Sequence, residues 1–340
     1  MRDSADIKVF TTCPVSTLDK ARACVRRIEN VARWSEAAGC EGILVFSDNR
    51  QLDPWLVSRA IIGATDRLCP LVAVQPAYAH PYTIAKTIAS FGFMYGRKLY
   101  LNMVAGGFAN DMQALNDATP HDQRYVRLVE YTKIIQELLR SDEPVTFDGA
   151  FYKIANLRMV PPLPTELQPP VFVSGSSDAG RNAASELGAT AIEYPMPAAD
   201  ASQQGDRPHK KPEYGIRIGI ITHREEARAW SIAHDRFPDD RKGQLTRQLA
   251  TKVSDSRWHQ QLSALADNEG RSGNYWLAPF RNYQAMCPYL VGSFDQVAAE
   301  LARYVDDGCT TFILDEPASE EDMQHTGFAF ELVTEHYAAA

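Results

Sequence analysis

Gly175, Ser176 and Ser177 form a short turn of small residues that could hold an anion. The turn follows the apolar run PVFVS, and it precedes a segment of small residues that predicts a helix beginning at Asp178. Backbone N–H groups, two hydroxyls and the positive end of the helix dipole would converge on an anion there. Ser176 or Ser177 serving only as an N-cap is the simpler interpretation, and the pattern alone leaves both open.

A second polar cluster begins the segment TPHDQRYVRLVEY, residues 119–131. Thr119 as N-cap, Pro120 in the first helical position and Asp122 three residues after Thr119 together predict a capped helix. Arg124 and Tyr125 would lie in its first turn, either as functional groups or as an ordinary surface pair.

Several common sites are excluded because their motifs are absent. The chain has no GxGxxG after its first apolar run, no P-loop, no HExxH and no GxSxG. Its eight histidines are scattered without ligand spacing, so we predict no metal site. A hydrolase would need paired carboxylates at strand ends, and Asp48, Asp315 and Glu316 are more typical of loop caps.

The pattern of the whole chain predicts the elements that position these residues. Helical segments are expected within 18–40, 53–68, 80–96, 121–142 and 293–308, and they alternate with apolar, strand-like runs. The eight predicted strands are 7–12, 42–47, 71–77, 98–107, 170–177, 189–195, 215–222 and 310–317. Alternation implies parallel pairing, which fits an open doubly wound sheet or a closed barrel. Eight units without a break in composition favour an α/β fold of the (β/α)8 TIM-barrel type.

Three segments interrupt this alternation. Residues 143–157 predict a small β-hairpin with Asp148-Gly149 as its turn. Residues 197–214 are too rich in Pro, Asp and Gln for a full crossover helix. Residues 223–289 form the largest insertion, and insertions at the carboxyl ends of barrel strands usually make lids or pocket walls. We therefore expect one domain over 1–340 with a lid at about 223–289.

The composition is that of a globular protein without a nucleic-acid or membrane partner. The formal charge is −8, and no stretch reaches the length of apolar residues that a membrane span needs. The six cysteines show no CxxC spacing, and several lie within apolar runs, which is typical of reduced, buried thiols. These features predict a cytoplasmic protein.

Six motifs together resemble one family, the bacterial-luciferase-like flavin-dependent monooxygenases, in the branch that contains alkanesulfonate monooxygenase. They are LYLNMVAGG (99–107), HDQRYVRLVEYTKIIQELL (121–139), VTFDGAFYKI (145–154), PPVFVSGSSDAGRNAA (169–184), YGIRIGI (214–220) and LVGSFDQVAAELARYVDDGCTTFIL (290–314). They cover most of the chain in the family's order. The resemblance implies a barrel that binds reduced FMN at its carboxyl-terminal face and uses O2 as co-substrate.

The resemblance also implies roles for individual residues. Gly175, Ser176 and Ser177 would hold the FMN phosphate, and Tyr125 would reach the same phosphate or the ribityl chain. The ribityl chain and the flavin ring would be lined by Asn102, Val104, Ala105, Gly106 and Ser47.

The chain departs from the alkanesulfonate branch at several positions. Gln51 stands where that branch has a cysteine, and of an Arg-x-His pair the chain keeps Arg217 but has Gly219 for the histidine. Tyr283 stands for an arginine of that branch, and a histidine of that branch falls at Cys13 or Pro14. Pro317 stands for a tyrosine. We therefore expect a small organic substrate other than an alkanesulfonate, such as a biosynthetic intermediate. Arg217 and Gln51 are the candidate catalytic residues, with Cys13 and Tyr283 in the substrate pocket.

Partners follow from the same resemblance. The chain lacks a fingerprint for NAD(P)H, so we expect a two-component system in which a separate NAD(P)H:flavin reductase supplies FMNH2. The family also implies a homo-oligomer, a dimer or tetramer. Two alternatives remain open: an F420-dependent oxidoreductase on the same barrel, and a non-catalytic flavin-binding protein.

Overall fold

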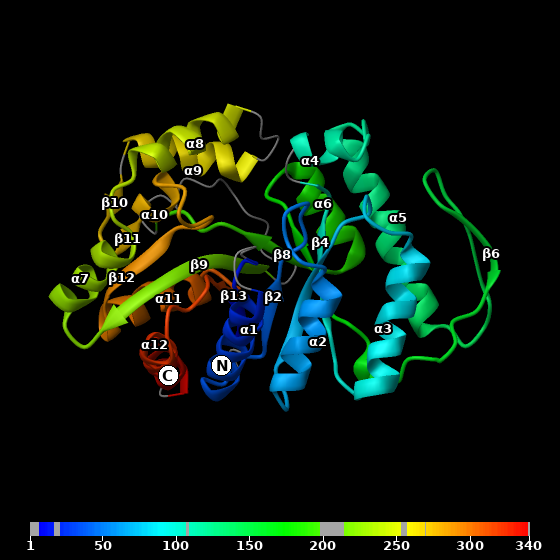
Figure 1. Cartoon of the computed structure of the whole chain (residues 1–340), viewed down its shortest axis with the longest axis horizontal. Coiled ribbons are helices and arrows are strands. Elements are labelled where there is room, and N and C mark those ends of the chain that lie inside the picture. Colours follow the sequence, from blue (N-terminus) through cyan, green and yellow to red (C-terminus); the bar gives the residue numbers. More distant parts are fainter. Residues whose placement is uncertain are drawn as a thin grey trace.

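Eight parallel strands close on themselves in a barrel (Figure 1). The computed structural model describes residues 7–16, 21–106, 109–197, 214–252, 257–268 and 270–338. In order around the barrel, the strands are β1 (Lys8–Thr12), β2 (Gly42–Val45), β3 (Cys69–Val74), β4 (Tyr100–Val104), β7 (Val171–Ser174), β8 (Thr190–Glu193), β9 (Tyr214–His223) and β13 (Cys309–Leu314). Phe10 of β1 pairs with Ile313 of β13, which closes the sheet. The predicted barrel is confirmed and the open sheet is excluded.

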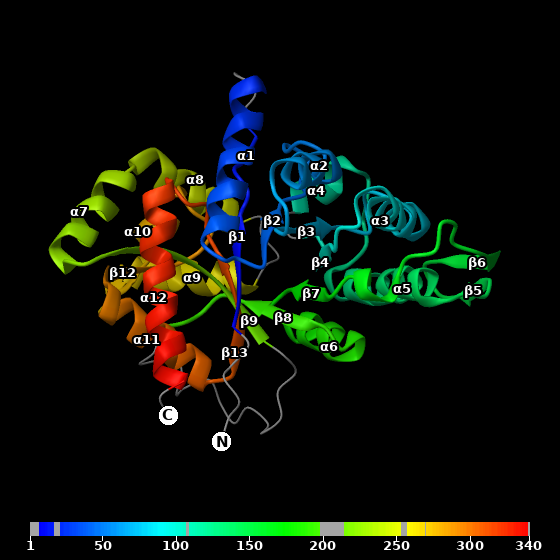
Figure 2. The same ribbon diagram turned by 90° about the horizontal axis from the view of Figure 1, so that it is seen from below.

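Helices cover the outside of the barrel (Figures 1 and 2). They are α1 (Ala21–Ala37), α2 (Pro54–Ala64), α3 (Pro81–Tyr95), α5 (His121–Arg140), α6 (Asp178–Leu187), α11 (Phe294–Asp306) and α12 (Glu320–Ala338). Local sequence sets several of their starts. Asp53 accepts hydrogen bonds from the first turn of α2, and Ser293 and Gln296 form a reciprocal capping box on α11. The predicted helical segments are confirmed.

Alternation along the strands separates the barrel interior from its outer shell. Phe10, Tyr100 and Phe172 meet edge to face inside the barrel, with ring centroids 5.1 to 5.7 Å apart. The next residue of β1, Thr11, points outward, and its hydroxyl lies 2.7 Å from that of Ser35 on α1. The core therefore has an inner layer within the barrel and an outer layer beneath the helices.

The hairpin at 143–157 is present, but its turn is longer than predicted. β5 (Val145–Asp148) pairs antiparallel with β6 (Lys153–Leu157), so that Asp148 lies opposite Lys153 in the ladder. The connection is Gly149–Tyr152, not a two-residue turn at Asp148-Gly149. Glu130 of α5 decides this, because its carboxylate accepts hydrogen bonds from three backbone N–H groups of residues 150–152.

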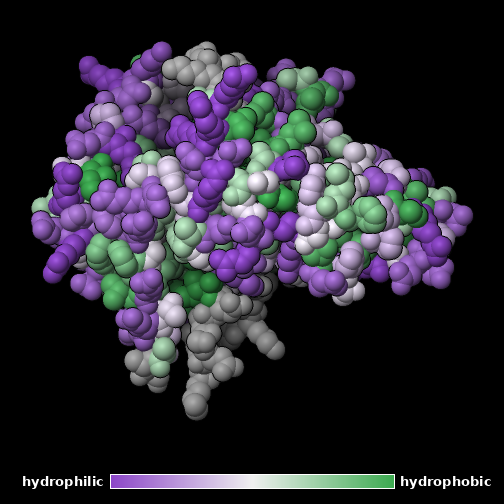
Figure 3. Space-filling view, turned by 60° about the horizontal axis from the view of Figure 1, so that its bottom comes forward, coloured by the Kyte–Doolittle hydropathy of each residue, from purple (hydrophilic) through white to green (hydrophobic). Residues whose placement is uncertain are grey.

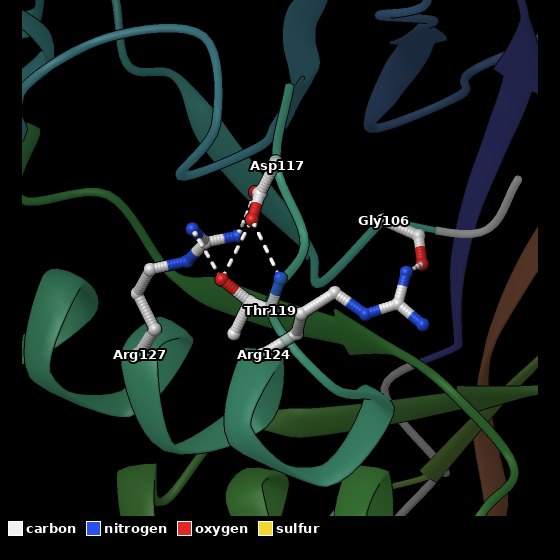
Figure 4. Close-up of polar contacts among 5 residues, drawn as sticks. All are labelled: Gly106, Asp117, Thr119, Arg124 and Arg127. Carbon is white, nitrogen blue, oxygen red and sulfur yellow. Dashed lines mark hydrogen bonds and ion pairs between the residues drawn. The ribbon is translucent and has the colours of Figure 1, made fainter. Parts of the chain in front are cut away.

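The predicted cap at Thr119 is wrong. Helix α5 begins at His121 after Pro120, and no side chain caps it. Thr119 instead donates its hydroxyl to Asp117, at 2.6 Å, and accepts a hydrogen bond from Arg127 (Figure 4). The Thr119 hydroxyl is engaged by two charged side chains, Asp117 and Arg127. Hydrogen bonds to charged groups are stronger than those to the neutral N–H groups of the helix N-terminus, so the hydroxyl does not cap α5.

The insertion after β9 contains α7 (Glu226–Arg236), α8 (Arg241–Lys252), α9 (Arg257–Asn268), β10 (Arg271–Ser272), β11 (Tyr275–Trp276) and α10 (Ala278–Arg281). An unpredicted strand, β12 (Tyr289–Ser293), then pairs with the outer half of β9, Gly219–His223. α4 (Ala109–Ala114) lies between β4 and α5, and a short 3₁₀ turn covers Thr165–Leu167. Of the segment 197–214, residues 198–213 lie outside the described residues.

The surface and the cysteines are ordinary for a globular protein. Figure 3 shows polar side chains over much of one face, with apolar groups scattered among them.

All six cysteines are free thiols, and five of them are buried. In the part of the chain that the structure describes, no helix has the length and apolar character to cross a membrane.

Candidate active site

A cavity of about 760 Å³ opens at the carboxyl ends of the barrel strands. Its floor includes apolar residues from the barrel, and α8 and α9 of the insertion add Leu249 and Trp258 to its wall. A pocket of this size and position is the usual place for a cofactor and substrate in a TIM barrel. Twelve of the thirteen predicted site residues line it: Ser47, Gln51, Asn102, Val104, Ala105, Gly106, Tyr125, Gly175, Ser176, Ser177, Arg217 and Tyr283.

The turn after β7 combines a helix cap with an unused hydroxyl. Ser177 is the N-cap of α6, and its Oγ accepts a hydrogen bond from the N–H of Gly180 at 3.1 Å. Ser176 Oγ is buried, and no described residue hydrogen-bonds to it. A buried hydroxyl beside a helix N-terminus could donate a hydrogen bond to an anion there.

Gly175 allows Tyr125 to approach this turn closely. A Cβ added at Gly175 would lie 2.4 Å from Tyr125 Oη, which is closer than real Cβ contacts. Burial raises the pKa of Tyr125, and a hydrogen bond with Ser177 opposes the rise. The phenol is therefore neutral at physiological pH and can donate to an anion. His121, whose ring meets Tyr125 edge to face at 5.3 Å, also lines the cavity.

Arg124 ties α5 to the end of β4. Its Nη1 donates to the carbonyl of Gly106 at 3.0 Å, and Gly106 has a φ of 104°, in the region that favours glycine (Figure 4). Arg124 is buried rather than a surface residue. It thus holds the 104–106 turn against the helix that carries Tyr125.

The loop before α5 is fixed by a second arginine. Arg127 Nη2 lies 2.6 Å from Asp117 Oδ2, and both side chains are only 12% exposed (Figure 4). Burial alone would raise the pKa of Asp117, but hydrogen bonds from Arg127 and Thr119 outweigh it and lower the pKa to about 2. The pair stays charged at neutral pH and fixes the start of α5.

Three polar residues on the β2 and β4 side are engaged with neighbouring strands or loops. Asn102 Oδ1 accepts from Ser174 Oγ at 2.8 Å, and the Ser47 carbonyl accepts from Gln75 Nε2 at 2.6 Å. Gln51 Oε1 accepts from both the N–H and the hydroxyl of Ser16. Gln51 therefore holds the loop after β1, whatever its part in catalysis.

Arg217 is the cation deep in the cavity. It is 8% exposed, its Cζ lies 4.7 Å from the centroid of the Phe46 ring, and its Nη2 lies 3.7 Å from Asp315 Oδ1. A hydrogen bond joins it to Tyr194, which also lines the cavity. Its Nε is buried and has no hydrogen-bond partner among the described residues. Arg217 thus both lines the pocket and forms an ion pair between β9 and the end of β13.

Cys13 lies outside the cavity, unlike the other predicted residues. Residues of β1 alternate, so Phe10 and Thr12 point inward, and Cys13 packs outward with Cys24 and Ile28 of α1. Burial, followed by the charge of Glu316, raises the pKa of its thiol. Position 13 therefore belongs to the outer core and not to the substrate pocket.

Several cavity residues were not predicted as site residues. Tyr194 and Trp258 stack at 3.9 Å with an interplanar angle of 17°, and so join the end of β8 to α9. Phe46 and Gln75 belong to the ends of β2 and β3, which were predicted, so position alone could have identified them. No sequence pattern marks Trp258, because its place depends on how the insertion folds. Within the described ranges, no group of three His, Cys, Asp or Glu side chains is placed to hold a metal ion.

The barrel, with a cavity at its carboxyl-terminal face, places the chain in a known class. The model of the luciferase-like monooxygenases matches residues 6–311, and the chain belongs to that family. It is therefore an oxidoreductase, as predicted.

Individual relatives agree with this assignment. The chain is 36% identical over 299 residues, 87% of each chain, to the 4-(gamma-L-glutamylamino)butanoyl-(BtrI acyl-carrier protein) monooxygenase BtrO of Niallia circulans. Its fold matches that of EDTA monooxygenase from Chelativorans sp. BNC1, with a TM-score of 0.71, 18% identity and coverage of 98% and 94% of the two chains. An F420-dependent secondary alcohol dehydrogenase shares the fold too, with a TM-score of 0.66, 15% identity and coverage of 96% and 99%.

Proposed function

We propose that this protein is an FMNH2- and O2-dependent monooxygenase of a two-component system. The observation that carries the proposal is the buried hydroxyl of Ser176 at the N-terminus of α6, which lines a cavity of about 760 Å³ and has no hydrogen-bond partner among the described residues. The first-turn N–H groups of a helix have no partners within the helix, so a phosphate there would gain several hydrogen bonds. Ser176, Ser177, Gly175 and Tyr125 would hold the phosphate, and Arg124 would hold the neighbouring 104–106 turn in place.

The rest of the cavity suits a flavin. Asn102 and the Val104–Gly106 turn would contact the ribityl chain, with Ser47 and Phe46 near the ring. Reduced FMN, when bound, would supply the electrons for O2 activation. The protein's own contribution is to exclude water, through the apolar floor and the insertion helices α8 and α9. We propose that the insertion acts as a lid, with the Tyr194–Trp258 stack as its contact with the barrel.

An F420-dependent oxidoreductase is the second candidate, because F420 enzymes share the fold. Contacts to a flavin-like ring and a phosphate-binding turn would suit FMN and F420 equally, so they do not distinguish the two cofactors. The relation to BtrO, at 36% identity, favours a monooxygenase over a hydride-transferring enzyme. A non-catalytic flavin binder is disfavoured because Arg217 extends a charged, under-satisfied group into the cavity.

The substrate class that we propose is a small organic acyl compound, carried as a thioester on an acyl-carrier protein. The support is the acyl-carrier-protein substrate in the name of BtrO. In addition, most of the alkanesulfonate clamp is absent, and Gln51, Gly219 and Tyr283 stand at its positions. We also propose that a separate reductase supplies FMNH2 and that the protein is a homo-oligomer, a dimer or tetramer.

Anaerobic titration with FMNH2 and with reduced F420, followed by rapid mixing with O2, tests this function. We expect FMNH2 to bind, and expect product to form when an acyl-carrier thioester is present. Stoichiometric F420 oxidation without O2 would support the alternative. Tight FMNH2 binding with no product from carrier-linked or free acyl substrates would indicate the passive binder.

A further inference from the structure

The strongest unexplained feature of the cavity is the set of groups behind Arg217. Asp315 lies at the carboxyl end of β13, and its backbone N–H donates to the carbonyl of Ile218 at 3.2 Å. This bond places the Asp315 carboxylate beside Arg217, with Oδ1 at 3.7 Å from Nη2. Asp315 does not itself line the cavity.

The other oxygen of this carboxylate is held from the opposite side. Asp315 Oδ2 accepts a hydrogen bond from Tyr289 Oη at 2.7 Å. Tyr289 is 2% exposed, and its ring meets Phe237 edge to face at 4.9 Å, so the phenol has little freedom to move. Burial, followed by the Asp315 charge, raises the pKa of Tyr289, so it remains a donor at neutral pH.

The Tyr289 ring also explains why position 219 is glycine. A Cβ on Gly219 would lie 2.3 Å from Tyr289 Cζ and 2.4 Å from two other ring atoms. A histidine at 219, as the alkanesulfonate branch would have, cannot be present together with Tyr289 in this arrangement. Backbone pairing of Tyr289 with Gly219 across β12 and β9 brings the ring to this place.

We infer that Asp315, held by Tyr289, is a positioning residue that orients the Arg217 guanidinium toward the reacting end of the cavity. Arg217 is constrained by three groups: the Asp315 carboxylate, the face of the Phe46 ring and the hydrogen bond with Tyr194. Charge pairing keeps the guanidinium in place at the cavity wall, where it can donate to an acceptor on a bound molecule. The Tyr289 ring thus fills the space that a side chain at position 219 of β9 would need. From there it holds Asp315, and Asp315 supports Arg217.

A role of this support in the reaction rests on the proposed function. The effect of Asp315 on the mobility of the Arg217 guanidinium can be measured without a substrate. In protein labelled with ¹⁵N-arginine, the Nε–H signal of Arg217 is assigned by its loss in Arg217→Lys. We expect Asp315→Asn to shift this signal and to speed its hydrogen exchange about tenfold or more, because the guanidinium is released. Tyr289→Phe should produce a smaller change of the same kind.

Arg247 and Asp267 provide a matched control within the same molecule. Arg247 is also buried and paired with an aspartate, but it lies in the insertion and does not line the cavity. Asp267→Asn should disturb the Arg247 signal and leave that of Arg217 unchanged. An Arg217 signal that is unaffected by Asp315→Asn, or equally affected by Asp267→Asn, overturns the inference.

Two further measurements separate this inference from the proposed function. FMNH2 affinity should fall less in Asp315→Asn than in Gly175→Val, since the proposed phosphate site lies on β7 and α6. Failure of the wild-type protein to bind FMNH2 would remove the proposed function and leave the arginine measurement standing. Asp315→Glu keeps the charge and should restore part of the slow exchange; exchange as fast as in Asp315→Asn would contradict the positioning role.

Discussion

The two ends of the cavity are built in different ways. At the phosphate end, Gly175, Ser176 and Ser177 are consecutive, and the helix that they introduce starts at Asp178. At the Arg217 end, the interacting groups come from β8, β9, β12 and β13, and no two of them are neighbours in sequence. The first end is a local motif supported by one partner helix, whereas the second exists only when the barrel is closed. Mutations should therefore act locally at the first end and at a distance at the second.

The largest effect is expected at the assembled end. In Gly219→His the new side chain would clash with the Tyr289 ring. This clash should lower the free energy of unfolding by about 3 kcal/mol or more. Urea unfolding measures the loss. In the double variant with Tyr289→Ala, the clash is relieved, so the loss should be smaller than the sum of the two single losses. Additive losses would show that Tyr289 does not occupy this space.

The phosphate end should respond through cofactor affinity rather than folding. Gly175→Val directs a side chain at Tyr125 Oη, and we expect FMN affinity to fall about tenfold to a hundredfold, measured by flavin fluorescence titration. Gly327→Val is the control, because an added Cβ at Gly327 on α12 meets nothing within 4 Å. Unchanged affinity in Gly175→Val would remove this turn from the cofactor site.

A pH-dependent effect should appear at the loop that leads into α5. The pKa of Asp117 is lowered to about 2 from 3.8, so the unfolded chain binds more protons than the folded one between these values. The Asp117–Arg127 pair thus contributes about 2 kcal/mol of stability above pH about 4, lost as pH falls toward 2. Asp117→Asn should be less stable than wild type by that amount at pH 7, with the difference vanishing near pH 2. A difference that is constant across this range would contradict the ion pair.

The smallest effect is expected from the cap of α6. Ser177→Ala removes the acceptor for the Gly180 N–H and should cost about 1 kcal/mol of stability. FMN affinity should fall less than in Gly175→Val, because the first-turn N–H groups remain. Equal losses of affinity in the two variants would mean that the hydroxyl, and not the shape of the turn, dominates the binding of the phosphate.

Several structural features were predictable because they depend on short spacing or on the overall alternation. The barrel followed from eight apolar runs, and the start of α6 from small residues after an apolar run. The cap at Thr119 was predicted wrongly because Asp117 and Arg127 offer its hydroxyl stronger partners. Cys13 was placed in the pocket by alignment, but the alternation of β1 turns it outward.

The sequence by itself determined the class of fold, the family, and a glycine–serine turn before a helix, because these are encoded by residues that are close together or regularly spaced. Only the tertiary structure decided that Tyr289 lies over Gly219, that Asp315 supports Arg217, and that Trp258 stacks on Tyr194. The physical reason is that barrel closure and strand β12 bring together residues far apart in the chain. Their contacts depend on register and packing, and no local spacing records them.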